Sequence, residues 1–223
     1  GPRMSPPSTT RLPTEERQAA IIAAALRLTR EFSPALVTTG DIAEAVGVTQ
    51  GALFKHFGTK EAIWQAAMRW VRETLLAQLQ QAADDSATPA DALGAVFRTH
   101  VEFVMAHPGV PRVIFHELQQ PADSLPKQEV RALLLGYRKL LLSTLERAVS
   151  AGQLAADLDV DAAATAFVGL IQGLVMQSML SGRPVRMRFA NTIINSAKRL
   201  RYKEAQAIID QARRIPHPDG PRS

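Results

Sequence analysis

The chain has 223 residues, of which 46% are apolar and 21% are charged, and it contains no cysteine. This length suits one or two small domains with a real core, and the lack of cysteine excludes disulfides and thiolate metal sites. We therefore expect a cytoplasmic protein. No run of apolar residues approaches the roughly 18 that indicate a membrane span, so we expect no membrane partner.

The net charge of +5 is distributed unevenly. Residues 1–60 carry +2, residues 61–185 carry −3 and residues 186–223 carry +6. A basic bias suits a polyanion such as nucleic acid, although +2 does not by itself identify a nucleic-acid-binding protein. The basic residues of 198–223 are best explained as a solvated tail, and whether that tail touches DNA stays open.

Both ends of the chain are expected to be flexible. Residues 1–13 read as a Pro/Ser/Thr-rich arm, in which Gly1 to Arg3, before Met4, are interpreted as a cloning remnant. The arm has no apolar stretch typical of a secretory signal. Residues 215–223 are expected to form a flexible tail.

Helix-start and helix-stop signals recur along the chain, whereas strand-type alternation is hard to find, so we predict an all-α fold. The first helix starts near Thr14, and Pro34 is expected to end it. Longer helices are predicted over residues 60–83, 89–107, 127–151 and 159–181, and from 185 to beyond 202. A helix of about two turns is predicted over residues 112–120.

Two short helices are predicted between these. Thr38 and Asp41 fit a capping box at the start of a helix that Gly47 closes. Thr49 caps the next helix, which buries Leu53 and ends at residues 57–58, and Thr59 begins the helix after it. Helices this short are marginal alone, so their geometry should serve a purpose.

A helix that lies in the major groove of DNA must be held at a fixed angle, and a preceding helix joined through a tight glycine turn does this. Ile42, Ala45 and Val46 are expected to face inward. Gln50 can pair with a base and Lys55 with a phosphate. A generic helical hairpin is the alternative. The predicted DNA-binding residues are Thr38, Thr39, Thr49, Gln50, Gly51, Ala52, Phe54, Lys55, His56 and Lys60.

The segment TTGDIAEAVGVTQGALFKHFGTKEAIWQAAM, residues 38–68, resembles the DNA-binding region of the tetracycline-repressor (TetR) family of bacterial regulators. The matching elements are Thr-Thr before Asp-Ile-Ala, then Gly-Val-Thr, Gly-x-Leu-Phe-x-His-Phe, and Lys-Glu at the start of the next helix. The match covers about residues 15–68, and the remainder matches only in layout.

The resemblance implies an N-terminal three-helix helix-turn-helix domain over residues 14–59. It also implies a larger C-terminal helical bundle over residues 60–214 that dimerises and binds an effector. By motif position it places DNA contacts on Thr39, Thr49, Gln50, Gly51, Phe54, Lys55, His56 and Lys60.

Some positions depart from the family pattern. Gly40 stands where the family often has arginine, so one base or phosphate contact can be missing. Phe54 replaces a frequent tyrosine and so lacks a hydroxyl for a phosphate. Thr29 stands where an aromatic residue is common, and Phe32 is expected to fill that space.

Small residues recur on one face of the helix predicted over 159–181, at Ala162, Ala166, Gly169 and Gly173. Such a face lets another backbone come close. We predict that this helix and the one near 186–202 form a four-helix bundle with a second subunit. Packing within one chain is the alternative.

An effector site needs an enclosed, mostly apolar cavity with a few polar anchors. Candidates are Trp70, Phe97, Val101, Phe103, Met105, Phe115, His116, Tyr137 and Met176, although residues of these types are more often plain core. The histidines at 100, 107 and 116 lack tight ligand spacing, so no metal site and no cofactor are expected.

The sequence contains no phosphate loop, no His-Glu-x-x-His, no Gly-x-Ser-x-Gly and no dinucleotide fingerprint, so an enzyme is not expected. The predicted function is a transcriptional regulator, a repressor that binds a palindromic operator as a homodimer and is released by a small, mostly apolar effector. The alternative is a helical interaction scaffold that does not bind DNA.

Overall fold

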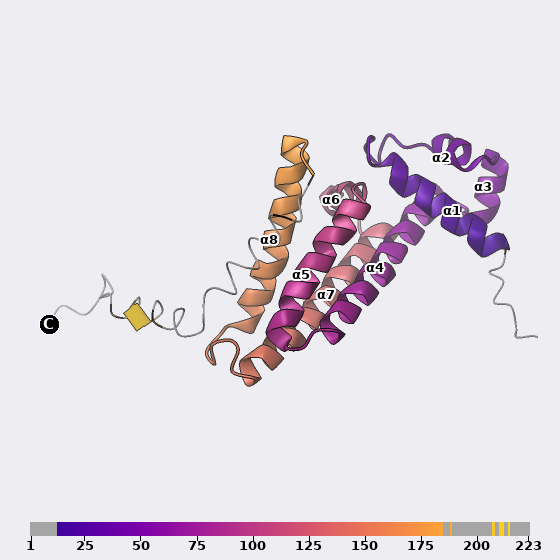
Figure 1. The fold of residues 1–223 in the computed structure, drawn as a ribbon. Helices are drawn as coiled ribbons and strands as arrows, with labels where there is room; N and C mark the ends of the chain where they lie inside the picture. The colour runs from indigo at the N-terminus through magenta and orange to yellow at the C-terminus, as the bar shows by residue number, and fades with distance from the viewer. Residues whose placement is uncertain (1–12, 185–187, 189–206, 208–209, 212–213, 215–223) are drawn as a thin grey trace, which may run out of the picture. The chain divides into compact units, whose positions relative to one another are not determined.

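A computed structural model describes residues 13–184, 188, 207, 210–211 and 214. This part of the chain forms α-helices and no strand (Figure 1), which confirms the predicted all-α fold class. The helices are α1 (Pro13–Leu28), α2 (Thr39–Val46), α3 (Gln50–His56), α4 (Lys60–Asp84), α5 (Pro89–Ala106), α6 (Val110–Gln119), α7 (Leu125–Ser150) and α8 (Val160–Ser181). The predicted helix at 186–202 and most of both predicted flexible ends lie outside the described residues.

The described helices separate into two packing units. The first unit contains α1 to α3, the start of α4 as far as Glu73, and residues 107–132 with α6. The second unit contains residues 74–106 and the chain from Leu133 onward, including α8. Compactness defines these units, so the functional boundaries predicted at residues 14–59 and 60–214 stay predictions.

Helix α1 ends at Leu28, well before Pro34, so the predicted end of this helix is wrong. The Thr29 hydroxyl donates to the Leu26 carbonyl at 2.6 Å, and the Arg30 N–H bonds the Arg27 carbonyl at 3.1 Å. These short-range bonds tighten the last turn and satisfy carbonyls that the helix leaves free.

Thr29 is fully buried because the residue before α6 packs on it. A Cβ on Gly109 would overlap the Thr29 hydroxyl oxygen and would lie 2.6 Å from the Leu26 carbonyl oxygen. The Arg112 Nε also donates to the Thr29 carbonyl at 3.0 Å. Phe32 is 51% exposed, so the expectation that it fills the space beside Thr29 is wrong, and a glycine from a distant part of the chain comes close there instead.

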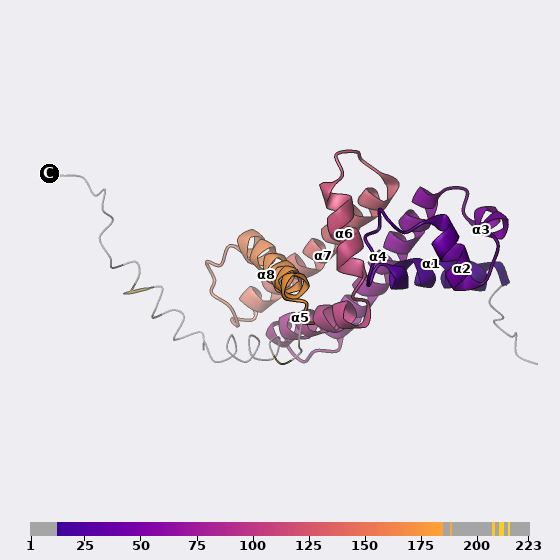
Figure 2. The same cartoon turned by 90° about the horizontal axis from the view of Figure 1, so that it is seen from above.

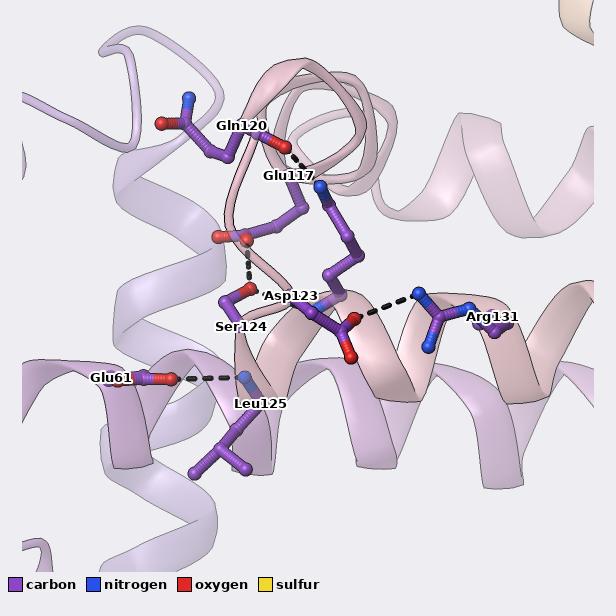
Figure 3. A network of polar contacts seen from close by, with 8 residues as sticks. Glu61, Glu117, Gln120, Asp123, Ser124, Leu125 and Arg131 are labelled. Carbon is purple, nitrogen blue, oxygen red and sulfur yellow. Dashed lines mark hydrogen bonds and ion pairs between the residues drawn. The ribbon is translucent and has the colours of Figure 1, made fainter.

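Hydrogen bonds also join α4, the α6–α7 loop and the start of α7 within the first unit (Figure 3). The Glu61 carboxylate accepts the N–H of Leu125 at 3.0 Å and so caps α7. The Ser124 hydroxyl donates to the buried carboxylate of Glu117 at 2.9 Å. The helix that follows α3 is thereby tied to the start of α7, more than sixty residues away in sequence.

A buried carboxylate makes a second tie between α4 and α7. Glu129 is 9% exposed, and its two oxygens accept from Arg69 Nε at 3.2 Å and from Arg72 Nε at 2.9 Å. Two positive charges and two hydrogen bonds offset the cost of taking this carboxylate out of water.

Aromatic side chains form part of the core of the second unit, where α8 lies beside α5 (Figure 2). The rings of Phe97 and Phe167 meet edge to face with their centroids 5.8 Å apart, and Tyr137 lies 6.5 Å from Phe167. At the start of α8, Arg138 Nη2 pairs with the Asp161 carboxylate at 2.8 Å. The aromatic core and this ion pair fix α8 against its neighbours.

Helix α8 is the one helix of the described chain that is long and apolar enough to cross a membrane. No uninterrupted apolar run of this length occurs in α8, because Thr165, Gln172 and Gln177 interrupt it, but the helix is apolar on average. Length and composition alone do not distinguish a membrane span from a packed helix of a soluble protein.

Candidate nucleic-acid interface

Helix α2 is fixed at both ends by local hydrogen bonds, as the sequence predicts. The Thr38 N–H donates to the Asp41 carboxylate at 2.9 Å, and the Asp41 N–H donates to the Thr38 hydroxyl at 3.0 Å. The bond from the Thr38 backbone lowers the pKa of the Asp41 carboxyl. At the other end Gly47 has φ +78°, a left-handed conformation that suits glycine and lets the chain turn sharply into α3.

The buried face of α2 includes Ala43 in place of the predicted Ala45. Ile42 and Ala43 are buried and Val46 is half-buried, whereas Ala45 is exposed. The prediction that Ala45 faces inward is wrong because residues 42, 43 and 46 share one face at 3.6 residues per turn, and residue 45 lies outside it. That face packs on α1.

Helix α3 has seven residues and buries a single one of them. The Thr49 hydroxyl accepts the N–H of Ala52 at 3.1 Å and so caps the helix, as predicted. Leu53 is fully buried and anchors the helix to α1 and α2. A helix this short is held by its cap, by this anchor and by the tight turn before it.

The remaining side chains of α3 face outward. Gln50, Gly51, Phe54 and Lys55 are exposed, and Phe54 keeps 42% of its surface accessible. Ala52 and His56 are half-buried at the edges of this face. One short helix therefore presents a carboxamide, an aromatic ring and an amine on a single exposed surface.

The predicted threonines and Lys60 lie at helix starts around this face. Thr38 and Thr49 are exposed, and Thr39 and Lys60 are half-buried. The capping hydroxyls accept a bond through oxygen and keep their own hydrogen for another acceptor, such as a phosphate oxygen. Thr59 caps α4 by accepting the Ala62 N–H at 3.1 Å, as expected.

This arrangement matches what a helix needs in order to read DNA. A glutamine can hydrogen-bond a base edge in the major groove, and lysine, histidine and helix N-termini can contact phosphates. The carboxylate of Asp41, in the first turn of α2, is occupied by the Thr38 cap. The outward face of α3 itself carries no acidic residue that would repel a phosphate backbone.

The residues predicted for an effector site are divided between the two packing units, so each group is described separately. Trp70, Phe115 and His116 belong to the first unit, where all three are half-buried. In the second unit Phe97, Val101, Phe103 and Tyr137 are buried, whereas Met105 and Met176 are 45% and 52% exposed.

His100 is half-buried beside Tyr137 and is missing from the predicted set. Its Nδ1 lies 2.9 Å from the Tyr137 hydroxyl oxygen, and burial lowers its pKa to about 4. Burial also raises the pKa of the Tyr137 phenol. A neutral imidazole and the phenol thus share one hydrogen bond through Nδ1. The sequence did hold a signal for His100. It lies three residues after Phe97 and four before Val104, so the three positions share one face of α5.

The small residues predicted for a dimer interface lie together on an open face of α8. Ala162, Ala166 and Gly169 are exposed and Gly173 is half-buried. A Cβ on Gly169 or Gly173 would meet no atom within 4 Å. Within the described chain, therefore, no neighbour comes close enough to require glycine at these two positions.

Two family models match the chain. Residues 21–67 match bacterial regulatory proteins of the tetR family, and residues 116–194 match the tetracyclin repressor-like C-terminal domain. The chain is 30% identical over 180 residues to the probable HTH-type transcriptional regulator ArpR of Pseudomonas putida, covering 77% of this chain and 84% of that protein. It is 29% identical, with the same coverage, to the HTH-type transcriptional regulator TtgR of Pseudomonas putida.

The fold resembles that of the transcriptional regulator FadR from Bacillus subtilis, which was solved in complex with stearoyl-CoA. The TM-score is 0.70 at 22% identity, and the match covers 79% of this chain and 95% of FadR. At this identity the likeness bears on the fold alone.

Proposed function

Because this chain belongs to the TetR family of bacterial transcriptional regulators, which bind DNA and are not enzymes, we propose that it is a repressor of this type. It binds a palindromic operator as a homodimer, and a small, mostly apolar effector releases it. The observation that carries the proposal is the division of α3, which buries Leu53 and turns Gln50, Phe54 and Lys55 outward.

In this proposal α3 enters the major groove. Gln50 contacts a base edge, and Phe54 and Ala52 supply apolar contact to bases or sugars. Lys55, His56 and Lys60 bind phosphates, together with the threonine hydroxyls at the helix starts. The carboxylate of Asp41 is already bonded within the α2 cap and α3 carries no acidic residue, so α3 and the helix starts around it present mainly donors to the DNA backbone.

A second copy of the chain completes the DNA-binding form. Two recognition helices must be about 34 Å apart to engage successive major grooves on one side of the duplex. We place the contact between copies on the open face of α8 formed by Ala162, Ala166, Gly169 and Gly173, since no neighbour in the described chain covers it. The predicted helix at 186–202, outside the described residues, completes this four-helix contact.

The effector-binding and dimerisation domain spans residues 60–214, and the DNA-binding domain spans residues 14–59. FadR of Bacillus subtilis holds stearoyl-CoA, a ligand with a long apolar chain. A mostly apolar effector is consistent with the predicted aromatic and aliphatic residues. Of these, Tyr137 and Phe97 are buried.

Effector binding changes the spacing of the two α3 helices, so both half-sites cannot be engaged together. The protein acts in the cytoplasm, where its DNA is.

The test is selection of bound duplexes from a random DNA pool, followed by titration of the selected site. We expect a two-fold-symmetric site. Lys55→Ala should weaken binding to all sequences and reduce the slope of log affinity against log salt by about 1 for each phosphate that the lysine neutralises. Gln50→Ala should change the preferred bases instead.

Lys139→Ala is the matched control, because Lys139 is an exposed lysine of α7 in the second unit. It should bind the selected site like the wild type. If the full-length protein shows no salt-dependent binding to any duplex, the scaffold alternative is correct. A selected site without two-fold symmetry contradicts the dimer.

A further inference from the structure

We infer that Gly40 determines the sequence preference of the DNA-binding surface by leaving the space in which the Gln50 side chain lies. This inference rests on the proposed role of Gln50 in contacting bases. A Cβ on Gly40 would lie 2.7 Å from Gln50 Nε2 and 3.9 Å from Gln50 Cδ. The carboxamide of α3 therefore lies against the first turn of α2, at the one position there that has no side chain.

The backbone conformation of Gly40 does not require glycine. The described glycines with positive φ are Gly47, Gly152 and Gly182, so Gly40 has an ordinary helical backbone. Inside a helix glycine costs about 1 kcal/mol relative to alanine. The close contact with Gln50 supplies a reason for glycine that the backbone does not.

The backbone at residue 40 cannot easily move away from an added side chain. It lies inside the capping box, where Thr38 and Asp41 exchange hydrogen bonds of 2.9 and 3.0 Å. A Cβ on Gly40 would also lie 3.6 Å from the Thr38 hydroxyl oxygen, an ordinary contact that leaves the cap intact. Any larger residue at position 40 must therefore displace the Gln50 carboxamide.

Moving the end of a flexible side chain costs the free protein little, but it changes what α3 offers to DNA. A glutamine reads a base by placing its oxygen and its N–H group together, so a displaced carboxamide loses that match. Gly40 is thus a positioning residue that acts through Gln50. It has no side chain with which to touch a base itself.

The experiment compares Gly40→Ala, Gln50→Ala and the double variant by selection from a random duplex pool and by titration of the selected operator. Gly40→Ala should melt at the wild-type temperature or higher, because alanine favours the helix. It should change the preferred bases at the same positions that Gln50→Ala changes. Discrimination there should fall about fivefold or more, the lower range for one good base contact.

The double variant tests whether Gly40 acts through Gln50, since only coupled residues depart from additivity. Adding Gly40→Ala to Gln50→Ala should change operator affinity by less than about twofold. The side-chain amide NMR signal of Gln50 in the free protein should shift in Gly40→Ala. It should not shift in the control Gly58→Ala, where a Cβ would meet no atom within 4 Å.

Two results overturn the inference and separate it from the proposed function. If Gln50→Ala changes the base preference and Gly40→Ala does not, the inference is wrong and the function stands. The same holds if the effect of Gly40→Ala persists in full when Gln50 is absent. If Gln50→Ala leaves the base preference unchanged, Gln50 does not read bases, and both the recognition contact and the inference fail.

Discussion

Lowering the pH from 7 to 5 should destabilise the second packing unit through His100. This side chain lies between α5 and α7, with its Nδ1 2.9 Å from the Tyr137 hydroxyl oxygen. Burial lowers its pKa from 6.5 to about 4. The folded protein therefore keeps the imidazole neutral at pH 5, whereas the unfolded chain protonates it.

The size of the effect follows from these two pKa values. Between pH 6.5 and 4 the unfolded state binds more protons than the folded state, so the free energy of unfolding falls as the pH falls. Each unit of pH in this window changes the free energy of unfolding by about 1.4 kcal/mol. At pH 5 the protein should be less stable than at pH 7 by about 2 kcal/mol through this one histidine.

Urea unfolding followed by circular dichroism at pH 7 and pH 5 measures this difference. Other groups also titrate, so the comparison is with His100→Gln, whose side chain can form a hydrogen bond but takes up no proton. The wild type should be destabilised by about 2 kcal/mol more than His100→Gln between the two pH values. Equal destabilisation of the wild type and His100→Gln would show that protonation of His100 is not opposed by burial.

Three substitutions test the packing of the first unit. Leu53→Ala removes the single buried side chain of α3 and should cost about 2–5 kcal/mol in denaturant unfolding, with loss of operator binding. Gly109→Ala forces a Cβ against the Thr29 hydroxyl and should cost about 1–3 kcal/mol, whereas Gly58→Ala should be nearly neutral in thermal melting. Glu129→Gln should cost about 1–2 kcal/mol in denaturant unfolding. The cost is kept moderate because one of its two arginine partners, Arg69, is half exposed, so water screens that ion pair. Unchanged stability of Leu53→Ala, Gly109→Ala or Glu129→Gln contradicts the corresponding packing or hydrogen bond.

The helix-turn-helix could be predicted from the sequence because its signals are local. The capping pair Thr38 and Asp41, the turn at Gly47 and the cap at Thr49 each act within a few residues. Their hydrogen bonds are formed as expected. Residue type and spacing therefore suffice to set the ends of α2 and α3.

The features that could not be predicted depend on residues far apart in sequence. The end of α1 is set partly by Gly109 packing on Thr29, and Glu129 bonds arginines 57 and 60 residues away. The contact between Gly40 and Gln50 joins two helices across a turn. No local pattern indicates such contacts, because they arise only when the helices pack.

The burial of Leu53 alone among the residues of α3 has a consequence for how relatives of this protein diverge. Six of the seven positions in α3 make little contribution to the hydrophobic core, so most exchanges there leave folding intact. After gene duplication, one copy can acquire a new target site through a few substitutions in this helix while keeping the same scaffold.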